Sequence, residues 1–380
     1  MIKIVTIIGA RPQIIKAAAL SRAIKTKYSN KLQEIIVHTG QHYDANMSQI
    51  FFEELNIPKP DYNLNVGSGS HGKQTAAMIS GIEEILLKEK PNAIVLYGDT
   101  NSTLAGAVAA SKIHVPVVHI EAGLRSFSKA MPEEVNRIMC DHVSTLLFSP
   151  TKTGFENLLR EGFKKETAKP YTADNPKIYH CGDVMYDNSL YFSSVAETKT
   201  NILERLNLKK DFILATIHRN NNTDEPERLN ALFKSLNDIS LKYGLEVVLP
   251  LHPRTAKLLE TNLSKENLTA IKSNSGFKIT EPASFLEMIA LEKNCNLVMT
   301  DSGGVQKEAF YFEKPCVILR PETEWVELVE CGTAIVADAD EIRIKAAFEK
   351  LHSAASLKFP KLYGDGHAAE FICGEIVSNL

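Results

Sequence analysis

The chain has 380 residues and a formal net charge of −3, and its apolar and charged fractions are those of an ordinary globular protein. This length exceeds what one hydrophobic core usually serves, so two domains are expected. The charge gives no support to nucleic-acid binding, and no apolar run reaches the roughly 18 residues of a membrane span. Because the first residues are typical of a strand and not of a signal peptide, we expect a cytoplasmic protein that binds neither nucleic acid nor membrane.

Short apolar runs alternate with amphipathic stretches along the chain. In chain order, the expected strands are residues 4–8, 34–38, 93–97, 115–120, 146–149, 212–217, 246–251, 297–300 and 316–319. The expected helices include residues 16–27, 73–89, 103–112 and 226–243. Because the strands are rich in Val, Ile and Leu and do not alternate strictly, they are typical of parallel strands buried on both faces.

The strands form two series, and the break between them falls near residues 164–200, where the polar stretch 164–176 is typical of a loop. Strand–helix alternation on this scale predicts an α/β fold. We expect two Rossmann-like, doubly wound parallel-sheet domains facing a cleft.

Compact polar clusters follow nearly every expected strand. They are GARPQ at 9–13, TGQHYD at 39–44, GDTNST at 98–103, EAGLRS at 121–126, HR at 218–219, HPR at 252–254 and DSGG at 301–304. Ligands of open parallel sheets bind beyond the carboxyl ends of the strands. Turns and helix caps use the same residue types, but seven clusters in two domains favour the two walls of one polar cleft.

Two of these clusters suit anions. Arg11 follows a glycine-containing turn and precedes Pro12, which fits the first position of a helix, and Asp301–Gly304 is a second strand–turn–helix. A pair of anion sites suits a diphosphate, although each motif alone is also compatible with a simple capped helix. Since neither G-x-x-x-x-G-K-[ST] nor a G-x-G-x-x-G after the first strand is present, ATP hydrolysis and NAD binding lose their usual support.

Carboxylates are frequent in these clusters. Asp99 and Glu121 end buried strands, which favours a function, although Asp99 could also cap a helix. Glu133 could simply complement a helix start, and for Glu134 alone a structural role is favoured. His218 ends a strand and is compatible with phosphate binding, proton transfer or plain packing.

Neither metal nor redox chemistry is indicated. The six cysteines are scattered without a C-x-x-C pair and are interpreted as core residues. The histidines show no spacing typical of metal ligands, so no metal is expected.

Nine motifs in one order resemble the non-hydrolysing UDP-N-acetylglucosamine 2-epimerase family almost from end to end. They are IGARPQIIKAA at 8–18, TGQHYD at 39–44, YGDTNST at 97–103, HIEAGLRS at 119–126, MPEEVNR at 131–137, GDVMYDN at 182–188, HR at 218–219, HPRT at 252–255 and DSGGVQKEA at 301–309. The resemblance implies a GT-B-like pair of Rossmann-like domains: residues 1–180 with 364–380, where the final helix crosses back, and residues 181–363, which hold UDP. It also implies a UDP-sugar substrate, a homodimer and no cofactor.

The resemblance implies a substrate-binding set made of Arg11, Lys16, Arg137, Phe285, Met288, Ser302, Gly303, Gly304 and Glu308. The Ser302–Gly304 turn would hold the diphosphate together with Arg11 and His218, Glu308 would hold the ribose, and Phe285 would lie near the uracil with Met288. Lys16 would assist on the sugar–phosphate side.

The implied catalytic residues are Asp99, Glu121, Glu133 and His218. The implied reaction expels UDP from C1 while the C2 proton is removed, which gives a 2-acetamidoglycal, and then re-adds UDP with a proton on the opposite face. Such a reaction would supply precursors of surface polysaccharide. The alternatives are a hydrolysing 2-epimerase that releases free N-acetylmannosamine, a retaining GT-B glycosyltransferase, and an inactive nucleotide-sugar sensor.

Three positions depart from the common family pattern. Asn221 stands where a glutamate is frequent, Trp325 replaces an arginine, and ARPQ replaces TRPE around Arg11. This combination resembles the branch that acts on modified sugars such as UDP-2,3-diacetamido-2,3-dideoxyglucuronic acid.

Overall fold

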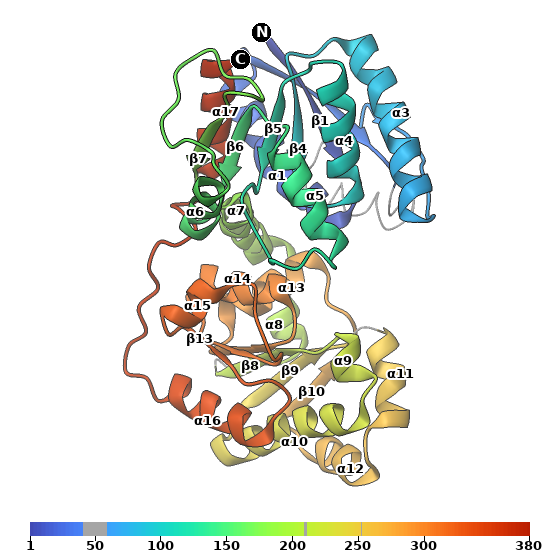
Figure 1. The fold of residues 1–380 in the computed structure, drawn as a ribbon. Helices are drawn as coiled ribbons and strands as arrows, with labels where there is room; N and C mark the ends of the chain where they lie inside the picture. Colours follow the sequence, from blue (N-terminus) through green and yellow to red (C-terminus); the bar gives the residue numbers. More distant parts are fainter. Residues whose placement is uncertain (41–58, 209–210, 252) are drawn as a thin grey trace. The chain divides into compact units, whose positions relative to one another are not determined.

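A computed structural model describes residues 1–40, 59–208, 211–251 and 253–380 (Figure 1). The chain forms two compact units, one made of Met1–Asn188 with Lys361–Leu380 and the other of Ser189–Pro360. Each unit is built on its own parallel sheet. The expected fold class, an α/β chain with two parallel-sheet domains, is confirmed.

The sheet of the first unit has seven strands in the order β3-β2-β1-β4-β5-β6-β7. Their bounds are Ile2–Ile8 (β1), Leu32–His38 (β2), Tyr62–Asn63 (β3), Ala93–Tyr97 (β4), Val117–Ile120 (β5), Leu146–Ser149 (β6) and Lys177–His180 (β7). All neighbouring strands run parallel, with β1 paired to both β2 and β4. Because the strand order reverses between β1 and β4, the carboxyl ends of these two strands flank the place where such sheets bind ligands.

Helices cover both faces of this sheet. They are α1 (Arg11–Ala23), the π-helical stretch η1 (Ile24–Tyr28), α3 (His71–Glu89), α4 (Asn101–Lys112), α5 (Pro132–Asp141), α6 (Lys152–Arg160), α7 (Val184–Lys199), which runs into the second unit, and α17 (Ala368–Asn379). Val5 and Ile7 of β1 share a core with Met78 of α3 and Ala105 of α4, whereas the alternate residues Ile4 and Ile8 of β1 point to the opposite face. Helices α3, α4 and α5 lie in a row, and α1 packs beside α17 (Figure 1).

The last helix is held in the first unit by the GDVMYDN segment. The Asp187 carboxylate accepts hydrogen bonds from the backbone N–H groups of Ala368 and Ala369, at 3.1 and 2.7 Å, and so caps the start of α17. Gly182 has a φ of +86°, and a side chain there would meet the Tyr363 carbonyl oxygen at 2.8 Å. Only glycine fits this close approach of the two backbones.

The sheet of the second unit has six parallel strands in the order β10-β9-β8-β11-β12-β13. Their bounds are Phe212–Thr216 (β8), Glu246–Pro250 (β9), Phe277–Thr280 (β10), Leu297–Thr300 (β11), Cys316–Ile318 (β12) and Ala334–Val336 (β13). The helices are α8 (Ile202–Arg205), α9 (Asn220–Thr223), α10 (Pro226–Tyr243), α11 (Pro253–Asn262), α12 (Lys265–Ser273), α13 (Phe285–Asn294), α14 (Gly303–Tyr311), α15 (Val326–Glu330) and α16 (Glu341–His352). Here the order reverses between β8 and β11, which are the strands followed by the HR and DSGG motifs.

The expected strands are confirmed with shifts of at most two residues at their ends, and helix α10 has the expected bounds. Two expectations were wrong in detail. Helix α1 begins at Arg11, five residues before the predicted start, because Pro12 suits the first turn and the Gln13 side chain accepts from the backbone N–H of Ala10, the N-cap residue. Strands β3, β7, β10 and β13 were not predicted; each has only two to four residues and lies at or next to a sheet edge.

Candidate functional site

Gln13 joins the two strand ends at the reversal point of the first unit. Its carboxamide oxygen accepts from the backbone N–H groups of Gly9 and Ala10, at 2.9 and 3.2 Å, and its Nε2 donates to the Tyr97 carbonyl at 3.0 Å. The side chain is buried and is fully used by these bonds and one to Thr103. The turn after β1 is therefore fixed to the turn after β4. In the sequence, Gln13 stands out only as part of the GARPQ motif.

Lys16 and Glu121 form an ion pair beside this junction. Both side chains are largely buried, with 13% and 12% of their surface exposed. Burial alone would lower the pKa of Lys16, but the Glu121 and Asp99 carboxylates outweigh it and raise that pKa. Lys16 is thus a firmly charged ammonium between two of the predicted catalytic carboxylates.

Glu121 has an unusual backbone conformation. Its φ is +76°, in the left-handed region that non-glycine residues rarely adopt. A side chain at Gly98 would meet the Glu121 carboxylate at 2.9 Å and the Lys16 ammonium at 3.2 Å, so the absence of a Cβ there leaves room for the pair. Strain of this kind persists where surrounding structure enforces it, and it is concentrated at functional sites.

Asp99 forms an ion pair with Arg137 of helix α5. The same guanidinium donates to Glu134 at 3.1 Å. Glu134 accepts from the backbone N–H groups of Ser126 and Phe127, at 2.8 and 2.9 Å. Although burial raises the pKa of Glu134, these bonds outweigh it and the pKa is lowered. Glu134 therefore anchors the loop before α5, as its predicted structural role requires.

The structure brings Asp99, Glu121, Lys16 and Arg137 together, and Thr100 rather than Asp99 caps the helix that follows. Glu133 lies exposed in the first turn of α5. Within the described residues, no hydrogen bond or ion pair joins Glu133 to Asp99, Glu121 or their cationic partners. Arg11 is exposed at the start of α1.

A buried polar network that was not predicted from the sequence adjoins the Gly98–Asp99 turn. The ring of His119 contacts the Asp141 carboxylate through Nδ1 at 2.6 Å and the Gly98 carbonyl through Nε2 at 2.8 Å. Arg125 pairs with Asp141 at 2.7 Å and with Glu161 at 2.6 Å. His119 and Arg125 belong to the HIEAGLRS motif, but their partner Asp141 lies on α5 and no sequence signal connects it to them.

In the second unit, Asp301 holds the turn after β8. Its carboxylate accepts from the backbone N–H groups of His218 and Arg219, at 3.1 and 3.0 Å, and from the Asn222 side chain at 3.1 Å. The His218 ring also lies against Asp301, with Nδ1 at 3.1 Å, while 47% of its side chain is exposed. The imidazole is thus oriented by a buried carboxylate and open to a ligand.

Ser302, Gly303 and Gly304 begin helix α14. Ser302 is the N-cap, and its Oγ lies 3.5 Å from the Val305 backbone nitrogen. Free N–H groups at a helix start favour an anion such as a phosphate. The Trp325 indole N–H donates to the Gly303 carbonyl at 2.9 Å, and the Lys307 ammonium lies 4.2 Å from the centre of the Trp325 ring.

The remaining predicted residues lie on the neighbouring helix pair of this unit. Phe285 is buried at the start of α13 and packs edge-on against Phe192 at 5.2 Å, and Met288 is half-buried one turn further on. Glu308 of α14 is half-buried and hydrogen-bonded to the buried Glu292 of α13. Burial and the Glu308 carboxylate raise the pKa of Glu292 well above its usual range, and a hydrogen bond between two carboxyl groups requires that the pair hold a proton.

Some predictions lie outside the described residues: Gln41 to Asp44 of the TGQHYD motif, and His252. The side chains of Pro253 and Arg254 are likewise not described.

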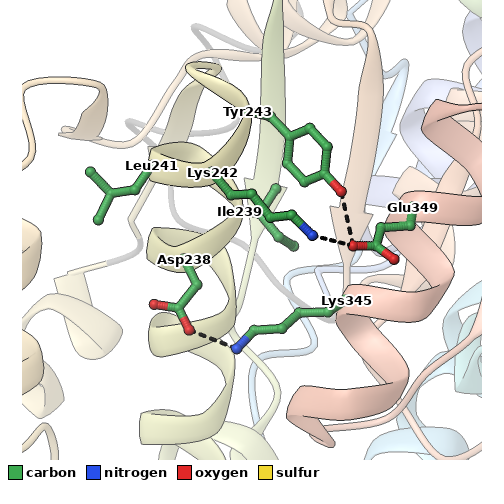
Figure 2. A pocket seen from close by; sticks show the side chains of 7 residues that line it. All are labelled: Asp238, Ile239, Leu241, Lys242, Tyr243, Lys345 and Glu349. Carbon is green, nitrogen blue, oxygen red and sulfur yellow. Dashed lines mark hydrogen bonds and ion pairs between the residues drawn. The ribbon is translucent and has the colours of Figure 1, made fainter.

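A surface groove between α10 and α16 is not a candidate site. Figure 2 shows that its charged side chains pair with each other: Lys242 with Glu349 at 2.5 Å, and Lys345 with Asp238 at 2.6 Å. Their charges are satisfied within the groove, and these exposed pairs add little stability.

Among the helices of the described ranges, none has both the length and the apolarity that a membrane span requires.

The two sheets, with polar groups at both reversal points, define a GT-B-like α/β protein. An α,α-trehalose 6-phosphate synthase from Burkholderia multivorans, 10% identical, shares this fold with a TM-score of 0.53 over 100% of this chain and 92% of that chain. The model of the UDP-N-acetylglucosamine 2-epimerase family matches residues 24–377. The chain belongs to that family, as its motifs predict.

Two relatives are especially similar. A UDP-2,3-diacetamido-2,3-dideoxy-D-glucuronate 2-epimerase from Pseudomonas aeruginosa is 50% identical over 371 residues, which cover 97% of this chain and 98% of that protein. The structure of a UDP-GlcNAc 2-epimerase from Methanocaldococcus jannaschii, 40% identical, superposes with a TM-score of 0.86 over 99% of this chain and 100% of that chain. The same M. jannaschii enzyme has been crystallised with UDP-GlcNAc and UDP.

Proposed function

We propose that the chain catalyses the reversible C2 epimerisation of a UDP-linked N-acetylhexosamine without hydrolysing it. The observation that carries the proposal is the pair of cation-bound carboxylates, Asp99 and Glu121, at neighbouring strand ends in a member of this epimerase family. Carboxylates placed in this way suit proton transfer, and the adjacent ammonium and guanidinium suit an anionic substrate.

The chemistry requires UDP to leave. C2 of a pyranosyl hexosamine is not next to a carbonyl, so loss of its proton alone gives no stabilised anion. If a carboxylate takes the C2 proton while the C1–O bond to UDP breaks, a C1=C2 double bond forms and the products are a 2-acetamidoglycal and UDP. Re-formation of the C1–O bond, with a proton delivered to the opposite face of C2, completes the epimerisation. The sugar has the same oxidation state before and after the two steps, so the reaction needs no oxidant or reductant.

Each unit has its own part in this proposal. The first unit supplies Asp99, Glu121 and Glu133 for proton transfer and stabilisation of charge at C1, with Lys16 and Arg137 on the sugar side. The second unit binds UDP, through the N–H groups at the start of α14, Glu308 at the ribose, and the aromatic start of α13 near the uracil. His218 and Arg11 act on the departing diphosphate.

We propose the 3-acetamido uronate analogue, UDP-2,3-diacetamido-2,3-dideoxy-D-glucuronate, as the preferred substrate. The support is the 50% identity to the P. aeruginosa enzyme of that name, together with Asn221 and Trp325 at positions where many family members differ.

The test is an incubation of purified protein with this uronate, and separately with UDP-GlcNAc, in heavy water. The expected result is a UDP-linked C2 epimer with deuterium at C2, formed faster from the uronate. Free sugar plus UDP as the sole products would identify a hydrolysing enzyme, and tight binding without exchange at C2 would identify a sensor.

We also propose that the protein is a homodimer through helix α5. Phe127, Met131, Val135 and Met139 are 77%, 43%, 38% and 45% exposed, and the last three recur every four residues along one side of the helix. An apolar stripe of this kind is typical of an interaction surface. Light scattering after size-exclusion chromatography should give twice the chain mass, and V135D should give the monomer mass.

All six cysteines are free, which suits the reducing cytoplasm.

A further inference from the structure

The buried His119 links the two loops that carry the proposed catalytic carboxylates. Strand β5 ends at Ile120, so His119 lies two residues before Glu121, and its ring reaches across to the Gly98 carbonyl next to Asp99. The Gly98 N–H in turn donates to the Ile120 carbonyl at 3.0 Å. The Gly98 residue is therefore fixed at both its N–H and its carbonyl by groups of β5.

The Asp141 carboxylate contacts residues before and after Glu121 in the chain. One carboxylate oxygen contacts His119, and the other accepts from the backbone N–H of Gly123 at 3.1 Å. A single fully buried carboxylate thus contacts the His119 ring before Glu121 and the Gly123 backbone after it, and the φ of +76° at Glu121 needs such enforcement.

The contacts of the His119 ring define its protonation. A carboxylate oxygen faces one ring nitrogen and a carbonyl oxygen faces the other, and both are acceptors, so both nitrogens must carry a proton. Two cations, His119 and Arg125, and two anions, Asp141 and Glu161, then balance within the network. Burial on its own lowers the pKa of His119, but Cys140 and Asp141 outweigh it, and the pKa is raised well above its ordinary value.

We propose that His119 is a positioning residue of the epimerase reaction: its ring, hydrogen-bonded through both nitrogens, fixes the Gly98–Asp99 turn to the end of strand β5 next to Glu121. It does not touch substrate. Its effect is to keep two carboxylates of different strand ends at a fixed separation while protons move on and off C2, and the inference rests on the proposed function for that step. Misplacement of reacting groups by about 1 Å costs on the order of 100-fold in rate.

The first measurement reads the ring directly in the wild-type protein. In ¹⁵N NMR of histidine-labelled enzyme at pH 8.5, histidines with an ordinary pKa of about 6.5 are neutral. One doubly protonated imidazolium should persist at this pH, and its absence would overturn the proposal. This readout does not depend on activity, so it is separate from the proposed reaction: if wild-type enzyme fails to exchange the C2 proton, the proposed function fails and the imidazolium signal still reports on His119.

The second measurement compares H119Q with a matched control, E34Q. Glu34 is a titratable residue on another strand of the same sheet, and its carboxylate accepts from the Thr6 and Ser21 hydroxyls, at 2.6 Å each. H119Q should lower kcat about 10- to 100-fold with KM and UDP affinity changed less than about 3-fold, whereas E34Q should keep kcat. Wild-type kcat in H119Q, or equal losses of kcat and UDP affinity in both variants, would contradict a positioning role.

Discussion

The Lys16 ammonium and the Glu121 carboxylate form a largely buried ion pair between helix α1 and the end of strand β5. The residues are 105 positions apart in the chain. Their pairing depends on the reversal of strand order beside β1, which places α1 next to the ends of β4 and β5.

Removal of the Glu121 charge should abolish most of the turnover. E121Q keeps the size of the side chain but cannot accept a proton from C2, so kcat should fall by roughly 10²- to 10⁴-fold. UDP affinity, measured by calorimetry, should stay within about twofold because UDP is assigned to the second unit. K16M should also lower kcat, since it leaves Glu121 without its cation, whereas K25M in the adjoining η1 segment is the control. An active E121Q would remove Glu121 from the mechanism.

Trp325 should contribute to UDP binding through two separable contacts. W325F loses the indole N–H bond to Gly303 but keeps a ring beneath Lys307, and it should weaken UDP binding by about 1 kcal/mol, or roughly fivefold. W325R also brings a like charge to Lys307 and should bind UDP more weakly than W325F. Calorimetry at low and high salt separates the two effects, because only the charge repulsion is screened. Equal affinities for wild type and both variants would show that this contact is irrelevant to UDP.

The Glu292–Glu308 pair should make UDP binding sensitive to alkaline pH. Burial and Glu308 raise the pKa of Glu292, so its stabilising contribution is present at low pH and is lost as the pH rises through that raised pKa. E292Q retains a hydrogen-bond donor for Glu308 without a titrating proton. Its melting temperature and UDP affinity should therefore vary less with pH than those of the wild type. E292A should bind UDP about tenfold more weakly, or ~1.4 kcal/mol. Parallel pH profiles in wild type and E292Q would contradict the shared proton.

Asp187 should link stability to pH in the opposite sense from an ordinary salt-bridged carboxylate. Burial raises its pKa from 3.8 to about 6, despite the two N–H groups of α17 that it accepts from. Its contribution to folding stability is therefore greatest at low pH and is lost as the pH rises through about 6. The stability of D187N relative to wild type should increase between pH 5 and 7, by about 1 kcal/mol. Calorimetric melting of both proteins, with E370Q on the same helix as control, measures this difference.

The residues that can be predicted from the sequence pattern are those that lie just after the ends of strands. Asp99 and Glu121 in the first unit, and His218 and Ser302 in the second, stand within two residues of the end of an expected strand, and each parallel sheet gathers such positions at one edge. The resemblance implies Asp99 and Arg137 as site residues, but their ion pair was not predicted, because the two residues are 38 positions apart in the chain.

Other features depend on tertiary structure. The His119–Asp141 contact joins a buried strand residue to the last residue of a helix, and in the sequence nothing distinguishes Asp141 from a solvent-exposed residue at a helix end. The left-handed backbone of Glu121 has no compositional signal, since glycine or asparagine would be expected there. Short strands such as β3 and β13 have too few residues for a periodicity to be recognised.

In the proposed mechanism, the C1–O bond to UDP breaks and re-forms during epimerisation. This is tested with substrate that carries ¹⁸O in the oxygen that bridges C1 and the β-phosphorus, recovered after partial reaction and analysed by ³¹P NMR. The label should move from the bridging to the non-bridging β-phosphate positions, because free UDP can rotate before it re-adds. Epimerisation with the label held entirely in the bridge would contradict this mechanism.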